Sequence, residues 1–443
     1  TVQVPETTPA TDFISIQFFQ GGWYQPIPMQ QISENLWNFT LSSGFSTEQP
    51  LQYRFCRNNL CSLTGQPPAN QDASVNFSSG QAVEVKIDQW AWIPIAKPVL
   101  QASLQSSISN KSAGFISGME WNSCATAMLS GQTITAGIAE TSQMGSNLLV
   151  IRQNISSESI RRQRRPVSDN STYITALNTV GTQSATTNNL RLAFFPTPAL
   201  DGSNSTSANW IDWFSDYRQN VFDIVAQTKG TAEILILGGE WIAPYLPPDP
   251  QYTYTSIAPG DADTRWVEFI QQVRSEFHGE IWFALPAEIS FSAPPVFLND
   301  VDTLYLILDP ASYANEDLQD QLGNLLDGSI QEIHRIYDKP LVIGFQAPAV
   351  SSKAVDIATQ NQFACDNWSQ NWAQWQAKYP VDLQLQLNTY QIFLSALTER
   401  EWINGFISEG NNPGLHQYDY SSNVYGKPAS ELLTYWNRQI KGK

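Results

Sequence analysis

The sequence predicts an α/β protein in which a barrel of eight parallel strands, a (β/α)8 or TIM barrel, follows a small all-β domain. Two patterns predict it: apolar residues alternate along the first part of the chain, and apolar runs then alternate with helical segments. The 443 residues exceed the roughly 250 of one such barrel, which leaves room for a second domain. The predicted boundaries are 1–95 for the all-β domain, 96–112 for a linker and 113–443 for the barrel.

Residues 1–95 consist of short segments with a period of two, separated by clusters of Gly, Pro and Asn. This pattern is typical of strands that bury one face, and it predicts a β-sandwich of an immunoglobulin-like or carbohydrate-binding-module-like kind. The close spacing of Cys56 and Cys61 fits a disulfide at the end of a hairpin. The segments with this period are 13–18, 36–41, 52–56 and 82–87.

Beyond Gly114, eight apolar runs are separated by amphipathic segments, the count of a closed barrel rather than of an open doubly wound sheet. The Gly-rich first turn of such an open sheet is absent from the sequence. The runs are 115–119, 147–152, 191–195, 233–237, 281–285, 303–308, 341–345 and 403–408. The clearest helical segments are 210–227, 263–277, 315–337, 383–397 and 429–440.

Composition narrows the function. With 24 basic and 41 acidic residues the formal charge is −17, so a nucleic-acid partner is not expected. No apolar run reaches the roughly 20 residues of a membrane span. The chain is rich in aromatic residues (15 Trp, 16 Tyr, 21 Phe), as secreted proteins that bind sugars often are. We therefore expect a secreted or cell-surface protein with a carbohydrate partner; nothing in the sequence indicates an oligomeric state.

Carboxylates follow five of the eight predicted strands. Catalytic residues of such barrels lie at the carboxyl ends of the strands, so these acids are candidate site residues. They are Glu120, Glu240, Glu288, Asp309 and Glu409. Glu240 is the strongest candidate, because two glycines before it permit close approach and Trp241 after it could exclude water and favour a proton donor.

The sequence predicts no metal and no cofactor. The three histidines are scattered, and neither a nucleophile elbow nor a phosphate or dinucleotide loop is found. The remaining chemistry is hydrolysis by paired carboxylates, in which one carboxyl protonates the leaving oxygen and another attacks the anomeric carbon or activates water. A glycoside hydrolase is therefore predicted. The alternative is a non-catalytic glycan-binding or cell-surface protein on the same scaffold.

The barrel resembles the clan A glycoside hydrolases, above all those similar to mannanases. The motifs that carry the resemblance are Gly239-Glu240-Trp241, the Lys-Pro and apolar run of 339–346, the strand-8 motif of 402–406, and the closing helix begun by 425–429. The resemblance covers roughly residues 230–440. It implies that the Glu after strand 4, here Glu240, is the acid/base and that a Glu after strand 7 is the nucleophile.

The chain departs from this family at strand 7, where Gln346 stands in place of the nucleophilic Glu. Three interpretations follow. Gln346 is an engineered Glu→Gln substitution that traps substrate; or it is natural and orients substrate or water, while Asp309 or Glu409 completes the pair; or the barrel only binds glycan. The aromatic residue of the family's strand 8 is also missing, since Ser408-Glu409 stands there, which favours a role for Glu409.

The remaining candidates are predicted to bind substrate. Aromatic side chains on rim loops stack on sugar rings, and Arg152 could hold a hydroxyl or orient a catalytic carboxylate. The alternative for the aromatic side chains is packing within the loops, and the alternative for Arg152 is an ion pair with Glu120. The predicted substrate-binding set is Glu120, Trp121, Arg152, Trp241, Tyr245 and Glu288, with Tyr313 a further candidate platform.

Overall fold

The structure is a computed structural model. It describes residues 1–10, 12–19, 21–41, 50–58, 60–61, 73–75, 82–90, 111–112, 114–121, 131–155, 187–198, 207–228, 230–251, 253–309, 318–350, 381–411, 416 and 418–441. The predicted linker therefore lies almost wholly outside the described residues, as do Tyr313, Cys124 and Cys365.

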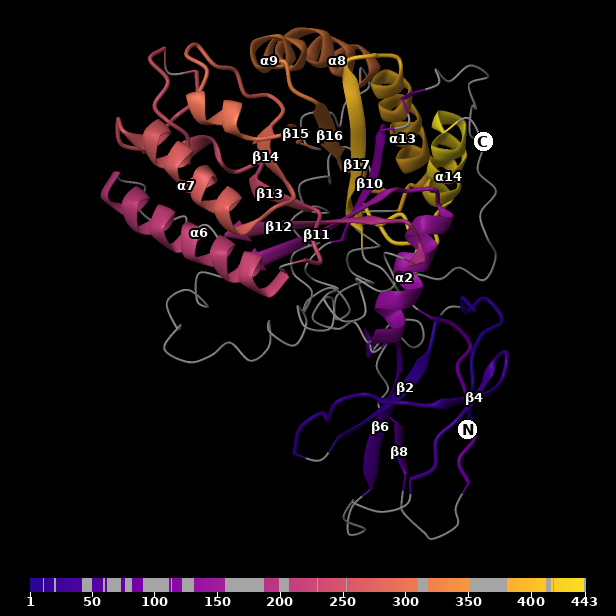
Figure 1. The fold of residues 1–443 in the computed structure, drawn as a ribbon. Helices are drawn as coiled ribbons and strands as arrows, with labels where there is room; N and C mark the ends of the chain where they lie inside the picture. The colour runs from indigo at the N-terminus through magenta and orange to yellow at the C-terminus, as the bar shows by residue number, and fades with distance from the viewer. Residues whose placement is uncertain are drawn as a thin grey trace.

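Eight parallel strands close into a barrel, as predicted, and helices surround it (Figure 1). Parallel strands of this kind are buried on both faces, which is why each reads as an apolar run in the sequence. The strands are β10 Ile116–Trp121, β11 Leu148–Ile155, β12 Arg191–Pro198, β13 Ile234–Gly238, β14 Glu280–Pro286, β15 Thr303–Ile307, β16 Leu341–Phe345 and β17 Ile403–Asn411. All eight predicted runs are confirmed as strands.

The helices pack their apolar faces on the outer side of the barrel. On α6, for example, Trp210, Phe214, Tyr217 and Val221 recur at helical spacing and are buried. The α-helices are α2 Gly131–Gln143, α6 Ser207–Thr228, α7 Ala262–Glu276, α8 Leu318–Leu325, α9 Gln331–Tyr337, α13 Leu383–Thr398 and α14 Pro428–Ile440. The shorter turns are η2 Ala243–Tyr245, η3 Val296–Asp300 and η5 Leu326–Ile330.

The barrel interior is a separate core of inward-facing side chains, among them Phe195, Trp282 and Tyr305. Outward-facing residues of the same strands, such as Phe194 and Phe283, belong to the core beneath the helices. Side chains alternate between the two faces of a strand. An inward side chain near the carboxyl end of a strand therefore points into the barrel interior at that end.

The first 90 residues form two small sheets around one hydrophobic core, which includes Val2, Trp37, Ile16 and Phe55. The sheet orders are β4-β5-β1-β9 and β3-β2-β6-β7, with β8 paired to β6. The strands are β1 Val2–Gln3, β2 Ile14–Phe19, β3 Ile27–Pro28, β4 Gln30–Ser33, β5 Leu36–Asn38, β6 Leu51–Arg57, β7 Leu60–Cys61, β8 Ala73–Val75 and β9 Val85–Lys86. Cys56 and Cys61 form the expected disulfide between β6 and β7.

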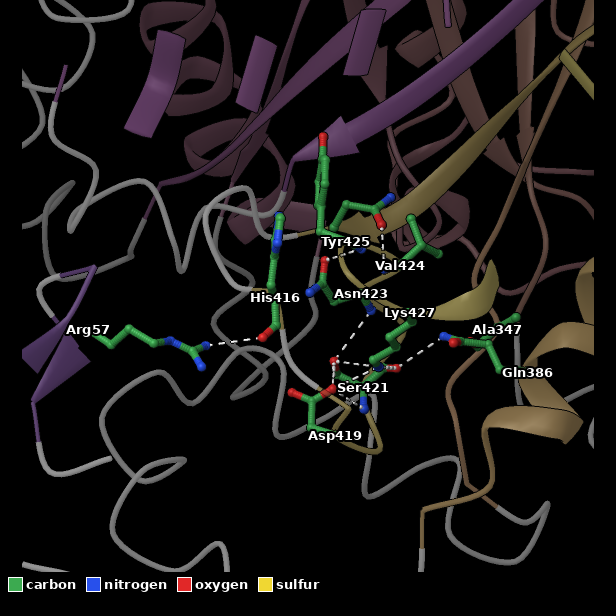
Figure 2. A network of polar contacts seen from close by, with 11 residues as sticks. Arg57, Ala347, Gln386, His416, Asp419, Ser421, Asn423, Val424, Tyr425 and Lys427 are labelled. Atoms are coloured by element: carbon green, nitrogen blue, oxygen red, sulfur yellow. Dashed lines mark hydrogen bonds and ion pairs between the residues drawn. The ribbon is translucent and has the colours of Figure 1, made fainter. Parts of the chain in front are cut away.

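The two-sheet unit contacts loops that follow the carboxyl ends of the barrel strands. Val350 and Tyr420, from the loops after β16 and β17, belong to the core of the two-sheet unit. Arg57 on β6 forms a buried ion pair with Asp12, 3.1 Å long, and donates a hydrogen bond to the carbonyl oxygen of His416 (Figure 2). The unit therefore supports loops on the rim where the predicted site residues lie.

Candidate functional site

Among the side chains that the structure describes, polar groups on four barrel strands face inward on the carboxyl-terminal side of the barrel. They are Glu120 on β10, Arg152 on β11, Tyr305 on β15 and Glu409 on β17, and all four are buried. Below them the barrel interior is apolar. Because catalytic groups of this fold lie at the carboxyl ends of strands, this buried cluster is the candidate active site.

Arg152 is the cation of this cluster, and it contacts two carboxylates. Its Nη2 donates to both carboxylate oxygens of Glu240, while its Nη1 lies 3.5 Å from Oε1 of Glu120. Its guanidinium carbon lies 4.8 Å from the ring centre of Phe195. Burial opposes the charge of Arg152, but Glu240, Glu120 and Glu409 together outweigh burial and raise its pKa. The guanidinium is therefore permanently charged, and the predicted ion pair with Glu120 is the weaker of two.

Glu240 follows a backbone turn that its two preceding glycines make possible. Gly238 and Gly239 have φ of +80° and +152°, a region that side-chain-bearing residues avoid. A Cβ on Gly238 would also collide with the carbonyl oxygen of Ala284. The turn leaves the Glu240 side chain 39% exposed while Arg152 holds both of its oxygens from within. Glu240 is thus the accessible carboxylate of the cluster.

Glu409 is fully buried and accepts a hydrogen bond from the hydroxyl of Tyr305. Gly344 on β16 leaves the space for this contact, since a Cβ there would overlap Glu409 and Tyr305. Burial and the neighbouring Glu120 raise the pKa of Glu409 well above its ordinary value, although Arg152 and Tyr305 act in the opposite direction. Desolvation favours the neutral acid.

Glu120 is 1% exposed. Burial raises its pKa to about 7; Arg152 lowers it and Glu240 raises it. In each of the two buried carboxyls, Glu120 and Glu409, the second oxygen (Oε2) has no hydrogen-bond partner within the described structure. The cluster therefore combines an accessible, ion-paired carboxylate with two buried carboxyls that favour the neutral form.

Gln346 lies directly after β16 and is partly buried. The hydroxyl of Ser422 donates to its Oε1 over 3.4 Å. Ser422 belongs to the loop after β17, in which Lys427 forms a buried 2.7 Å ion pair with Asp419 and donates to the carbonyl oxygen of Ser421 (Figure 2). This network holds the segment that contacts position 346.

Two predicted acids lie elsewhere. Asp309, after β15, and Glu288, after β14, are both exposed and lie outside the buried cluster. The sequence predicts Asp309 as a candidate second catalytic carboxylate, whereas the carboxyls that contact Arg152 are Glu240 and Glu120, and Glu409 is buried beside Tyr305. Sequence reasoning missed Tyr305, Gly344 and Ser422, although a Tyr at an inward position of an apolar run signals a buried hydroxyl that needs a partner.

The aromatic candidates pack against other side chains of the protein. The rim-loop position expected for Trp121 is wrong: Trp121 lies on β10, is fully buried among the outer core residues, and donates to the Tyr425 hydroxyl over 2.8 Å. Tyr245 stacks on Trp213 of α6 with ring centres 3.9 Å apart, and Trp241 contacts the same Trp213 edge-on. Trp241 and Tyr245 are thus partly exposed and pack on Trp213 at the base of a loop. This is the loop packing given above as the alternative to sugar stacking.

Within the described chain, no group of three or more His, Cys, Asp or Glu side chains is placed to hold a metal ion. In the same residues, no helix is long and apolar enough to cross a bilayer.

No protein-family model matches this sequence, and no curated protein matches it. Solved structures do match. A family GH113 β-1,4-mannanase in a complex aligns with 73% of this chain and 99% of its own, with a TM-score of 0.50 and 15% identity. The family GH113 β-mannanase from Alicyclobacillus acidocaldarius, in complex with ManMIm, aligns with 75% and 100%, with a TM-score of 0.50 and 18% identity. The barrel of this chain therefore has the fold of these glycoside hydrolases.

Proposed function

We propose that this chain is a glycoside hydrolase that cleaves a polysaccharide or oligosaccharide with carboxyl groups at the carboxyl end of the barrel. The observation that carries the proposal is a cluster of three carboxyls around one arginine: Arg152 contacts Glu240 and Glu120, and Glu409 acts on it through its charge. Glu240 is accessible and ion-paired, whereas Glu120 and Glu409 are buried and tend to be neutral. Carboxyls whose environments drive their protonation apart are the combination that acid and base roles require.

The ion pair changes the role that we assign to Glu240. The family resemblance implies a proton donor at this position, but a guanidinium that binds both oxygens is the partner of an ionised carboxylate. We therefore assign Glu240 the carboxylate role, in which it attacks the anomeric carbon or activates a water molecule. A neutral carboxyl of the buried cluster then serves as the source of the proton.

We further propose β-1,4-mannan as the first substrate to test, because the solved structures that share the barrel fold are named as mannanases. Secretion or display at the cell surface also remains our proposal. The disulfide between Cys56 and Cys61 supports it, because such bonds persist in oxidising compartments.

The experiment compares release of reducing sugar from β-1,4-mannan by the unaltered chain and by the Glu240→Gln variant. Loss of one catalytic carboxylate should lower kcat by about 10²–10⁴-fold. Glu268→Gln, an exposed substitution on α7, is the matched control and should retain full activity. Equal activity in the chain and in Glu240→Gln would overturn the assignment of Glu240.

A second candidate function is glycan binding without turnover. The observation that favours it is Gln346, an amide at the strand-7 position where the family resemblance implies a nucleophile. Calorimetric titration with manno-oligosaccharides distinguishes the two functions. Binding that persists for hours with no new reducing ends would favour a binding protein, whereas heat from continuing hydrolysis would favour an enzyme.

A further inference from the structure

We infer that Glu120 and Glu409 form a proton-holding pair, which keeps at least one proton at neutral pH. Because the pair then carries less negative charge, Glu240 is the main ion-pair partner of Arg152. The protonation of the pair does not rest on the proposed function; only its use in catalysis does. The resemblance to known hydrolases implies roles for residues after the fourth and seventh barrel strands, whereas this pair lies on the first and eighth, β10 and β17.

The backbone brings the two carboxyls together. Strands β10 and β17 are neighbours in the barrel, with Met119 opposite Ser408 and Trp121 opposite Asn411. The register shift between these pairs sets Glu120 opposite Glu409 and Gly410, the arrangement of a β-bulge. Adjacent strands lie about 4.8 Å apart, so two inward carboxyls at this level are close neighbours.

The charges that surround the pair do not balance if every carboxyl is ionised. Around the pair, β11 contributes Arg152, the turn after β13 contributes Glu240, β15 contributes the neutral Tyr305, and α13 places Tyr390 behind β17. Among the residues that the structure describes, one cation would then face three anions, two of which, Glu120 and Glu409, are buried. An uncompensated buried charge is strongly unfavourable, so a proton on the pair is the favourable state.

The hydrogen bonds are consistent with a proton on the pair. Each carboxyl uses one oxygen: Oε1 of Glu120 faces Arg152, and Oε1 of Glu409 accepts from Tyr305. Oε2 of each is buried without a partner in the described structure. An ionised carboxylate would leave these oxygens as buried, charged acceptors without a donor, whereas a proton on Oε2 removes the charge that burial disfavours.

The direct test is the infrared spectrum of the full chain in D2O at neutral pH. We expect the carbonyl stretch of a protonated carboxylic acid, weakened in Glu120→Gln and in Glu409→Gln and retained in the control Glu268→Gln. Asp12 is a third buried carboxyl with a raised pKa, so the signal must also persist in Asp12→Asn. Two ionised carboxylate signals from Glu120 and Glu409 at neutral pH would overturn the inference.

A second measurement is the pH dependence of stability, which needs no substrate. A folded-state pKa raised above the unfolded value stabilises the protein at low pH, and this stabilisation is lost as pH rises through the folded pKa, for Glu120 about 7. Urea unfolding of the unaltered chain should therefore show a midpoint that falls between acidic and neutral pH. The two Gln variants should show a smaller fall. An unchanged slope in both would contradict the inference.

If neither Gln variant folds, the Asp12→Asn variant still decides the question, because it removes the other buried carboxyl with a raised pKa. The acid signal of the pair should disappear only above the pH at which exposed carboxyls are ionised, while a spectrum without that signal at neutral pH contradicts the inference. Because neither measurement uses substrate, a failed proton-holding pair and a failed hydrolase function are separate outcomes.

Discussion

At the residue scale, the arrangement around Arg152 decides which carboxylate is the charged one. Glu240 receives two hydrogen bonds from one guanidinium nitrogen, while Glu120 lies 3.5 Å from the other. Glu409 accepts a hydrogen bond from Tyr305 and influences the guanidinium through its charge. The sequence places all three acids after strands, yet this difference depends on the side-chain geometry of three separate strands and could not be predicted from spacing.

Replacement of Arg152 by Met should destabilise the protein, because it leaves the carboxyls without their cation. Removal of one partner from a buried ion pair costs about 3–5 kcal/mol. The penalty should be smaller at about pH 5 than at about pH 8, since Glu120 and Glu409 are neutral in acid. Urea unfolding at the two pH values measures it, and an equal penalty at both would contradict the charge assignment.

Replacement of Gly344 by Ala should destabilise the barrel and disturb the hydrogen bond of Tyr305 to Glu409. The added Cβ would overlap both side chains, and overpacking of this kind costs about 1–3 kcal/mol. Gly260→Ala is the control, because an added Cβ there meets nothing within 4 Å. Thermal unfolding compares the variants, and equal midpoints would show that the space beside Glu409 is not limiting.

At the element scale, the eight strands could be predicted because burial on both faces makes each a continuous apolar run. The amphipathic segments that match α6, α7, α13 and α14 could be predicted because each helix buries one face, which places apolar residues at helical spacing. Helix α2 was missed, since its Thr and Gly residues weaken the helical period. Trp121 was misplaced because β10 continues through it beside the bulge, so alternation turns Trp121 outward and Glu120 inward.

Helix α13 packs against β17 next to Glu409, and substitution of its N-cap residue tests how much the helix contributes to stability. Asp382 at the N-cap accepts a hydrogen bond from the Leu385 amide over 2.8 Å, and Tyr390 of the same helix contacts the Ser408 hydroxyl over 2.7 Å. Asp382→Ala should lower the free energy of unfolding by about 1 kcal/mol, while Asp382→Asn should retain most of it. Equal losses in the two variants would exclude capping as the cause.

At the scale of the whole molecule, the two-sheet unit and the barrel share buried contacts. Arg57 pairs with Asp12 inside the unit and reaches the His416 carbonyl oxygen on the barrel loop. The neighbouring segment carries Ser422, which contacts Gln346. The sequence predicted two units from their different periods and favoured packing of the first on the barrel, but it could not predict which residues make the contact, because periodicity describes each unit separately.

Arg57→Met should therefore destabilise the whole chain by about 3–5 kcal/mol, because Asp12 is left buried without its partner. The double variant Arg57→Met with Asp12→Leu should recover much of this loss, since no charge then remains buried. Urea unfolding followed by tryptophan fluorescence measures both. A double variant as unstable as the single one would show that the loss comes from the contacts of Arg57 rather than from the buried charge of Asp12.

The central claim is that this chain hydrolyses glycan with Gln346 in place of a strand-7 carboxylate. The most direct measurement is reducing-sugar release by the unaltered chain and by Gln346→Glu across α- and β-glucans, mannans, xylans, galactans and arabinans. We predict turnover by the unaltered chain on at least one glycan. Turnover by Gln346→Glu alone would contradict the claim and identify position 346 as an inactivated nucleophile site, while binding without turnover in both would identify a glycan-binding protein.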